Sequence, residues 1–335
     1  MRSLFTAFSL TLFAAIAVGH DLSVVRSEEV TAFQSGKASF REIIVARHRD
    51  LLHDAAKYVE QNPNASDLDE VFAWGIETSR KLGLEADATP LAEKCLQSRA
   101  TPSALKTPAK QVFCIGLAKS GRLNEAITAF QDSLQTVRFN AAGESLDLAV
   151  ELVGQAGLAG DHAAARGIYG TLSNRLGLNP QVTEFCENRL KKLDLADTIA
   201  PEIDLTDLSG KLTTVSSFKG KVLLIDFWAT NCPPCLAEFP KLKQLYADYH
   251  QQGFEIVGLS LDESREIVEA FQARAQLPWP LVNEAEQVKM AREKYRVRTI
   301  PSLFLVGRDG RIANVDLKGN DLRQAVERCL KTKTP

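Results

Sequence analysis

Two cysteines, Cys232 and Cys235, lie three positions apart where an apolar stretch gives way to an amphipathic one. The β-branched run from Val222 to Trp228 predicts a buried strand, and apolar positions from Cys235 to about His250 repeat with a helical period. The thiols are therefore expected at a strand-to-helix turn, with Cys232 at the helix N-terminus. Unpaired N–H groups and the helix dipole favour a thiolate there, and the thiolate is the nucleophile.

A dithiol with this spacing can exchange a disulfide with another protein: Cys232 attacks, and Cys235 resolves the mixed disulfide. Pro233 and Pro234 cost little in the first helical turn, where backbone N–H groups have no partner. A zinc half-site uses the same spacing, but the sequence has no second Cys-x-x-Cys and no His pair at ligand spacing. A purely structural disulfide is the other alternative, and the flanking strand and helix favour redox chemistry over it. We predict no metal and no cofactor.

The segment Asp226-Phe-Trp-Ala-x-x-Cys-x-x-Cys235 resembles the active-site strand and turn of the thioredoxin superfamily. Lys219-Gly-Lys-Val before it, the Cys-Pro-Pro-Cys motif and Glu238-Phe-Pro after it resemble the TlpA/ResA branch of extracytoplasmic thiol-disulfide oxidoreductases. The resemblance implies that Asp226 is the family's buried acid. Asn231 replaces the Trp that is usual before the first cysteine and that forms part of the partner surface, so the resemblance does not define the substrate preference.

Further residues are expected around the dithiol. Thr299-Ile300-Pro301 precedes a strand, and the resemblance implies that Pro301 is cis, faces the dithiol and bars metal from the thiolates. The backbone of Ile300 is then expected to pair with an extended substrate segment. The substrate-binding residues predicted on this basis are Trp228, Asn231, Pro233, Ile300 and Pro301.

A second acid is expected at the end of the apolar strand 254–261, in Asp262-Glu263-Ser264. The carboxyl ends of parallel strands line the reactive edge of such a sheet. The resemblance implies an acid near the dithiol there, and Glu263 aligns best. Asp226 or Glu263 is expected to take the proton from Cys235. The alternative for Glu263 is a charge favoured by a helix N-terminus.

The chain has 335 residues, of which 45% are hydrophobic and 24% charged, which suits one to three globular domains. The net charge of −2 gives no reason to expect nucleic acid or an anionic membrane surface as a partner. Residues 1–19 combine Arg2, an apolar stretch and a small-x-small site, which predicts a secretory signal peptide. We therefore expect an extracytoplasmic, periplasmic protein; an anchor through an uncleaved N-terminal segment is the alternative.

Residues 20–197 show helical periodicity throughout, with breaks expected at positions such as Thr89-Pro90 and Gly121. Segments 112–130 and 150–169 look alike and resemble a degenerate tetratricopeptide repeat; an irregular helical bundle is the alternative. Cys95 and Cys114 fall on consecutive helices, so either a disulfide or two buried thiols is compatible with their positions.

Residues 201–335 alternate strands with helices. This pattern predicts an α/β thioredoxin-like domain whose central mixed sheet has helices on both faces. The predicted strands comprise a hairpin around Ser209-Gly210, parallel strands 222–228 and 254–261, and a second hairpin around Asp309-Gly310.

We expect an exported thiol-disulfide oxidoreductase. The resemblance favours a reductant of disulfide-bearing exported proteins, with cytochrome c apoproteins among the candidates, which needs a membrane-bound electron donor. A partner-binding helical protein with an accessory redox domain is one alternative. A peroxidase is another, but peroxiredoxins have Thr three residues before the reactive Cys, where this chain has Ala229. Nothing in the sequence predicts the oligomeric state.

Overall fold

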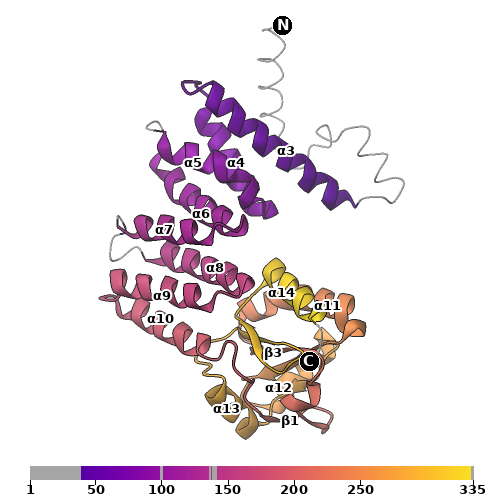
Figure 1. Cartoon of the computed structure of the whole chain (residues 1–335). Coiled ribbons are helices and arrows are strands. Elements are labelled where there is room, and N and C mark those ends of the chain that lie inside the picture. Colours follow the sequence, from indigo (N-terminus) through magenta and orange to yellow (C-terminus); the bar gives the residue numbers. More distant parts are fainter. Residues whose placement is uncertain (1–38, 99–100, 136, 138–141, 333–335) are drawn as a thin grey trace. The chain divides into compact units, whose positions relative to one another are not determined.

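The computed structural model describes residues 39–98, 101–135, 137 and 142–332 (Figure 1). The predicted signal peptide lies outside these residues. The chain divides into two compact units, Met1–Val137 and Arg138–Pro335. Within the described ranges, no helix combines the length and the apolar character needed to cross a membrane.

The first unit is entirely helical in its described part. Its core is formed by fully buried apolar side chains such as Leu52, Val71 and Leu91. The helices are α3 (Phe40–Gln61), α4 (Leu68–Leu82), α5 (Glu85–Gln97), α6 (Ser103–Lys119) and α7 (Leu123–Leu134).

The predicted break at Thr89-Pro90 is wrong, because α5 continues through Pro90. Ala88, Leu91 and Ala92 around this proline are completely buried, so core packing maintains the helix despite the lost N–H donor. Helices α5 and α6 pack so closely that a Cβ on Gly116 would lie 2.3 Å from the carbonyl oxygen of Glu85.

Cys95 and Cys114, on these two helices, are free, buried thiols. Burial raises the pKa of Cys95 and raises that of Cys114 to about 12. They are small apolar core residues rather than a disulfide.

The second unit begins with α8 (Gly143–Ala159), α9 (His162–Leu176) and α10 (Pro180–Leu193). Asn179 caps α10: its side-chain oxygen accepts a hydrogen bond from the N–H of Gln181 at 3.0 Å, and Pro180 occupies the first turn. Both segments of the predicted repeat turn at a left-handed glycine, Gly121 and Gly160. They lie in different compact units, and the tetratricopeptide-like repeat stays a prediction.

A five-stranded mixed sheet in the order β5-β4-β3-β6-β7 confirms the predicted α/β architecture. β3 is central, parallel to β4 and antiparallel to β6, and β4 is parallel to the short edge strand β5. The strands are β3 (Val222–Trp228), β4 (Phe254–Ser260), β5 (Leu281–Val282), β6 (Ser302–Val306) and β7 (Ile312–Val315).

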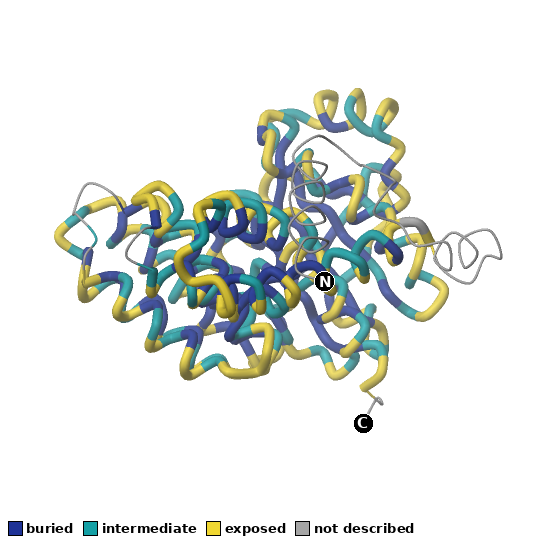
Figure 2. Tube along the Cα trace, turned by 90° about the horizontal axis from the view of Figure 1, so that it is seen from above, coloured by how far each residue is buried: buried dark blue, intermediate teal, exposed yellow. Residues whose placement is uncertain are grey.

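The alternation along β3 separates two apolar layers. Val222, Leu224 and Trp228 pack with α11 (Pro233–Tyr249), α12 (Arg265–Ala275) and α14 (Gly319–Lys331). Leu223 and the other odd positions pack with α13 (Ala285–Lys294) on the opposite face. Every residue of β3 and of β6 is buried; Figure 2 shows buried residues along the trace in dark blue. Asp226 belongs to the even series, so its position in β3 directs it toward the α11 side.

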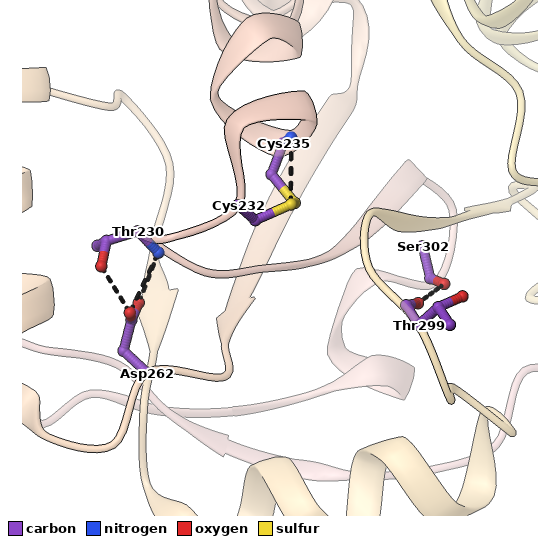
Figure 3. Close-up of a disulfide and its surroundings, with 6 residues drawn as sticks. All are labelled: Thr230, Cys232, Cys235, Asp262, Thr299 and Ser302. Carbon is purple, nitrogen blue, oxygen red and sulfur yellow. Dashed lines mark hydrogen bonds between the residues drawn. A yellow bond between two sulfur atoms is a disulfide. The ribbon is translucent and has the colours of Figure 1, made fainter.

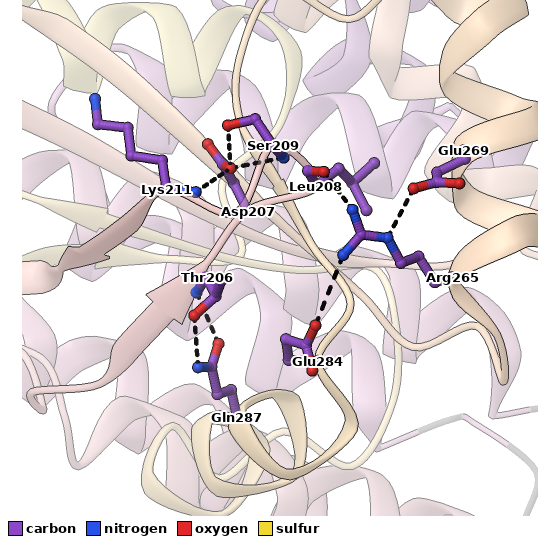
Figure 4. Close-up of polar contacts among 9 residues, drawn as sticks. All are labelled: Thr206, Asp207, Leu208, Ser209, Lys211, Arg265, Glu269, Glu284 and Gln287. Atoms are coloured by element: carbon purple, nitrogen blue, oxygen red, sulfur yellow. Dashed lines mark hydrogen bonds and ion pairs between the residues drawn. The ribbon is translucent and has the colours of Figure 1, made fainter.

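A separate antiparallel hairpin, β1 (Asp204–Thr206) and β2 (Leu212–Thr214), confirms the predicted turn at Ser209-Gly210. The Asp207 carboxylate accepts hydrogen bonds from Ser209 and from the N–H of Lys211, which closes the turn (Figure 4). Gln287 of α13 exchanges two hydrogen bonds with Thr206, at 2.7 and 2.9 Å, while Arg265 of α12 donates to the Leu208 carbonyl (Figure 4). Side chains of both helices therefore hold the hairpin.

Helices α8–α10 pack onto the α/β part of the same unit rather than standing apart from it. A Cβ on Gly157 of α8 would lie 2.9 Å from the Asn314 side chain of β7. The segment that joins α10 to the α/β part is paired with the sheet edge: the Asp197 N–H donates to the Ile312 carbonyl, and the Ile312 N–H to the Thr198 carbonyl, both at 2.9 Å. The sequence boundary near 197–201 thus marks a change of element type, while the compact units divide near residue 137.

Candidate active site

Cys232 and Cys235 lie where the sequence places them, at the turn between β3 and α11. Cys232 is the N-cap of α11, Pro233 and Pro234 form its first turn, and the two cysteines form a disulfide. The Cys235 N–H donates to the Sγ of Cys232 at 3.3 Å (Figure 3). A backbone donor aimed at this sulfur, together with the helix dipole, stabilises negative charge on Cys232 after reduction.

The two cysteines are both buried, but to different degrees. Cys232 is 7% exposed and Cys235 is 2% exposed. Asn231, Pro233 and Pro234 beside Cys232 are exposed. A partner disulfide can therefore reach Cys232 more easily than Cys235, as an attacking and a resolving thiol require.

The loop that leads into Cys232 is held by the end of β4. The Asp262 carboxylate accepts from the Thr230 N–H at 3.0 Å and from the Thr230 hydroxyl at 2.6 Å (Figure 3). It also accepts from the Ser260 hydroxyl at 2.7 Å. Glu263, the acid predicted from the sequence, is exposed. The acid of this segment that contacts the active-site loop is thus its neighbour Asp262.

Asp226 is 3% exposed. Burial, reinforced by the charge of Glu238, raises the pKa of Asp226 to about 7. Glu238 stands on α11, one turn after Cys235. One carboxylate oxygen is 3.1 Å from Lys241, and the other is buried without a hydrogen-bond partner among the residues that the structure describes. Glu238 is the functional candidate that the sequence analysis did not select, although its spacing of three from Cys235 puts both on one helix face.

The predicted cis bond between Ile300 and Pro301 is present. Both residues are half-buried and directly precede β6, which pairs with β3 through Ser302 opposite Phe227. The Ser302 hydroxyl donates to the Thr299 carbonyl at 2.7 Å and spans the turn (Figure 3). The loop before β6 and the turn after β3 therefore lie at one edge of the sheet.

Ser302 is also contacted from outside the α/β part. Lys192 of α10, only 3% exposed, lies with its Nζ 3.1 Å from the Ser302 hydroxyl and donates to the Asp316 carboxylate. Arg189 of α10 donates to the same carboxylate. A helix that precedes the thioredoxin-like domain in sequence thus fixes the residue that follows Pro301.

Trp228 does not belong to the exposed partner surface, which corrects its predicted substrate-binding role. Its side chain is completely buried and packs edge-on against Phe239 and tilted against Phe271, with ring centroids 5.0 Å away in both cases. The alternation of β3 directs position 228 into the α11 layer, beneath the dithiol.

Among the described residues, no group of three His, Cys, Asp or Glu side chains could hold a metal ion.

Comparison with known proteins covers the part of the chain that holds this site. A family model described as the AhpC/TSA family matches residues 196–315. The thiol-disulfide oxidoreductase ResA of Bacillus thuringiensis subsp. konkukian is 35% identical over 138 residues, 41% of this chain and 77% of the relative. The ResA of Geobacillus kaustophilus is 34% identical over 137 residues, 41% of this chain and 76% of the relative.

A solved structure, the thioredoxin domain of a thiol-disulfide oxidoreductase from Bacteroides vulgatus, is 32% identical and covers 41% of this chain and 98% of its own, with a TM-score of 0.39.

Proposed function

The chain belongs to the ResA-like thiol-disulfide oxidoreductases, and from this premise we propose that it reduces disulfides of exported proteins through Cys232 and Cys235. The observation that supports this use of the dithiol most directly is the hydrogen bond from the Cys235 N–H to the Cys232 sulfur at the N-terminus of α11. Of the two buried cysteines, Cys232 is the less buried, at 7% exposed against 2% for Cys235, as expected if Cys232 attacks and Cys235 resolves.

The proposed reaction starts from the reduced dithiol. The Cys232 thiolate attacks one sulfur of the partner disulfide, a mixed disulfide forms, and the other partner sulfur leaves and takes a proton. The Cys235 thiol then loses its proton and attacks the Cys232 sulfur, which releases the second partner sulfur. Two electrons pass to the partner, and the Cys232–Cys235 disulfide remains.

The proton of Cys235 is proposed to go to Asp226, whose pKa of about 7 lets it accept and return a proton near neutral pH. Glu238 supports this role because its charge helps to hold the pKa of Asp226 high. Glu263 is exposed, so for this residue we favour the alternative role, a negative charge near a helix N-terminus. Ile300 and Pro301, with Asn231 and Pro233, are proposed to contact the substrate segment.

The proposed location is extracytoplasmic, on the strength of the signal peptide predicted in residues 1–19. A reductant there needs a membrane-bound donor to reduce the disulfide again, because oxidising compartments do not do so. Cytochrome c apoproteins are candidate substrates. Ala229 is buried and has no hydroxyl, and the neighbouring Thr230 hydroxyl donates to Asp262. Both facts weigh against a peroxidase.

The test is a Cys235→Ser variant, which can form a mixed disulfide but cannot resolve it. We expect exported proteins to be trapped on Cys232, and a Cys232→Ser/Cys235→Ser control to trap none. In the matching activity assay, we expect the wild type to reduce insulin and the single variants Cys232→Ser and Cys235→Ser to be inactive. A dithiol potential near −120 mV or above, the range of strong oxidants, would instead make the protein an oxidant.

A further inference from the structure

A cavity of about 500 Å³ lies between α10 and α13, away from the dithiol turn itself. Lys191 of α10 lines one side of it. The segment that follows α13 and leads into the cis proline lines the other, through Arg296 and Arg298. The remaining charged lining residues are Lys289, Arg292 and Glu293 of α13.

Five cations and one acid line this cavity in a chain whose net charge is −2. Two of the cations have structural partners: Arg296 donates to the Lys191 carbonyl and to Asp194, both at 2.9 Å, and Lys191 lies 3.6 Å from Glu187. Lys289 and Arg298 are exposed and make no hydrogen bond or ion pair with any residue that the structure describes. Gathering unpaired like charges around a cavity costs free energy of folding, and an anionic ligand would offset that cost.

Arg292 gives a second, independent indication. Its Nε is buried and has no hydrogen-bond partner among the described residues. A buried donor without an acceptor costs free energy of folding, and a carboxylate that draws the Arg292 guanidinium toward the cavity would relieve that cost. A guanidinium presents paired N–H donors that match a carboxylate.

The position of the cavity relates this anion preference to the redox site. Arg298 precedes Pro301 by three residues, so the two are at most about 10 Å apart along the chain. A substrate segment that pairs with the backbone of Ile300 advances about 3.3 Å per residue. Side chains about two to five positions from its reactive cysteine would therefore reach the cavity.

We propose that this cavity binds acidic side chains of the partner polypeptide that flank its reactive cysteine, with Lys289, Arg292 and Arg298 pairing with the carboxylates. This inference rests on the proposed function and adds a substrate class to it. A polypeptide fits better than a free anion because the lining continues directly into the cis-proline loop. Helix α10 supplies one wall through Lys191, so the helical segment before the thioredoxin-like domain contributes to partner selection.

The test uses the full chain and two disulfide-linked peptides that differ only in carrying Glu or Gln on both sides of each cysteine. We expect kcat/KM to be about 10-fold higher for the Glu peptide at low ionic strength, and the ratio to approach one as salt shortens the Debye length. The variant Lys289→Glu/Arg298→Glu should lose the preference, because both side chains are exposed and unpaired. Lys106→Glu/Lys219→Glu is the matched control, with the same charge change on exposed lysines that do not line the cavity.

Equal kcat/KM for the two peptides in the wild type, or an unchanged preference in Lys289→Glu/Arg298→Glu, would overturn the proposal. Fluorescence anisotropy with the dithiol-free Cys232→Ser/Cys235→Ser variant measures peptide binding without exchange. If no disulfide is reduced at all, the proposed function fails, and tighter binding of the Glu peptide to this variant still supports the cavity. The remaining outcome is that both peptides bind equally while the protein binds anionic vesicles in a way that Lys289→Glu/Arg298→Glu abolishes. That result would assign the cavity to a membrane surface and refute the peptide site.

Discussion

Replacing Asp316, the buried carboxylate that α10 and the sheet share, is expected to destabilise the protein more than removing either cation that faces it. Asp316 follows β7 and accepts from both Arg189 and Lys192 of α10. It also accepts from the Leu303 N–H at 3.1 Å. Asp316→Asn keeps the size of the side chain and leaves two cations in the interior without an anion.

The expected cost follows from burial. Lys192 is 3% exposed, Asp316 10% and Arg189 20% at the side chain. Removing one partner of such a buried pair costs about 3–5 kcal/mol, because the other charge stays desolvated. Lys192→Met should cost less, about 1–2 kcal/mol, since Asp316 keeps Arg189 and the lysine's own desolvation penalty disappears.

The pKa directions agree with two cations sharing one carboxylate. Burial pushes the pKa of Asp316 upward, but Lys192 and Arg189 outweigh it and hold the pKa below 3.8. Burial lowers the pKa of Lys192, and the shared carboxylate only partly compensates. An acid whose folded pKa is depressed adds stability above its unfolded pKa and loses it as pH falls through the folded one. The difference between wild type and Asp316→Asn should therefore narrow below about pH 3.8.

The assay is urea unfolding followed by tryptophan fluorescence in a Trp74→Phe background. Trp228 and Trp279 then report only on the second compact unit. Asp248→Asn is the matched control: Asp248 pairs with Arg323 at 2.6 Å, but both side chains are about one third exposed, so its loss should cost under about 1 kcal/mol. The reasoning is refuted if Asp316→Asn costs no more than this control, or less than Lys192→Met.

Three further outcomes are expected. Burial and Glu238 raise the pKa of Asp226 from 3.8 to about 7, so the free energy of unfolding should fall as pH rises from 3.8 to 7. Asp226→Asn should flatten this pH dependence and be up to about 4 kcal/mol more stable than the wild type at pH 8, as measured by urea unfolding across pH. Ser302→Ala should raise KM for a disulfide peptide several-fold while a small disulfide reacts unchanged, and Ser302→Thr should restore KM. The fragment 138–335 should melt cooperatively by circular dichroism, whereas 200–335, which lacks α10, should melt at a lower temperature and bind a hydrophobic dye; equal melting would contradict the packing argument.

The sequence predicted the site well where its signals are local. The apolar run 222–228 is a strand with the predicted bounds, and the cysteine pair lies at the turn into the helix. The cis bond at Pro301 was implied by family resemblance and is present. The strand and the turn follow from residues that are neighbours in the chain, whereas the cis bond rests on the resemblance.

Identifying the second acid required knowing how elements that are distant in sequence lie next to each other. β4 ends at Ser260 and α12 begins at Arg265, so the residues between them form a loop whose direction periodicity does not define. Asp262 turns toward Thr230, and Glu263 turns outward. The alternation of β3 could have indicated that Asp226 and Trp228 share the face covered by α11, and hence that Glu238 on this helix lies near the buried acid.

Lys192 shows where sequence reasoning stops. It stands beside Lys191 near the end of an amphipathic helix, where lysines are expected in solvent and favoured by the helix dipole. One of the two is instead buried, because a carboxylate and a serine hydroxyl more than a hundred positions later accept from it. Such a charge is retained only if its partners are in place. The residue after the cis proline therefore depends on α10, which makes this helix part of the redox module even though the sequence assigns it to the helical half.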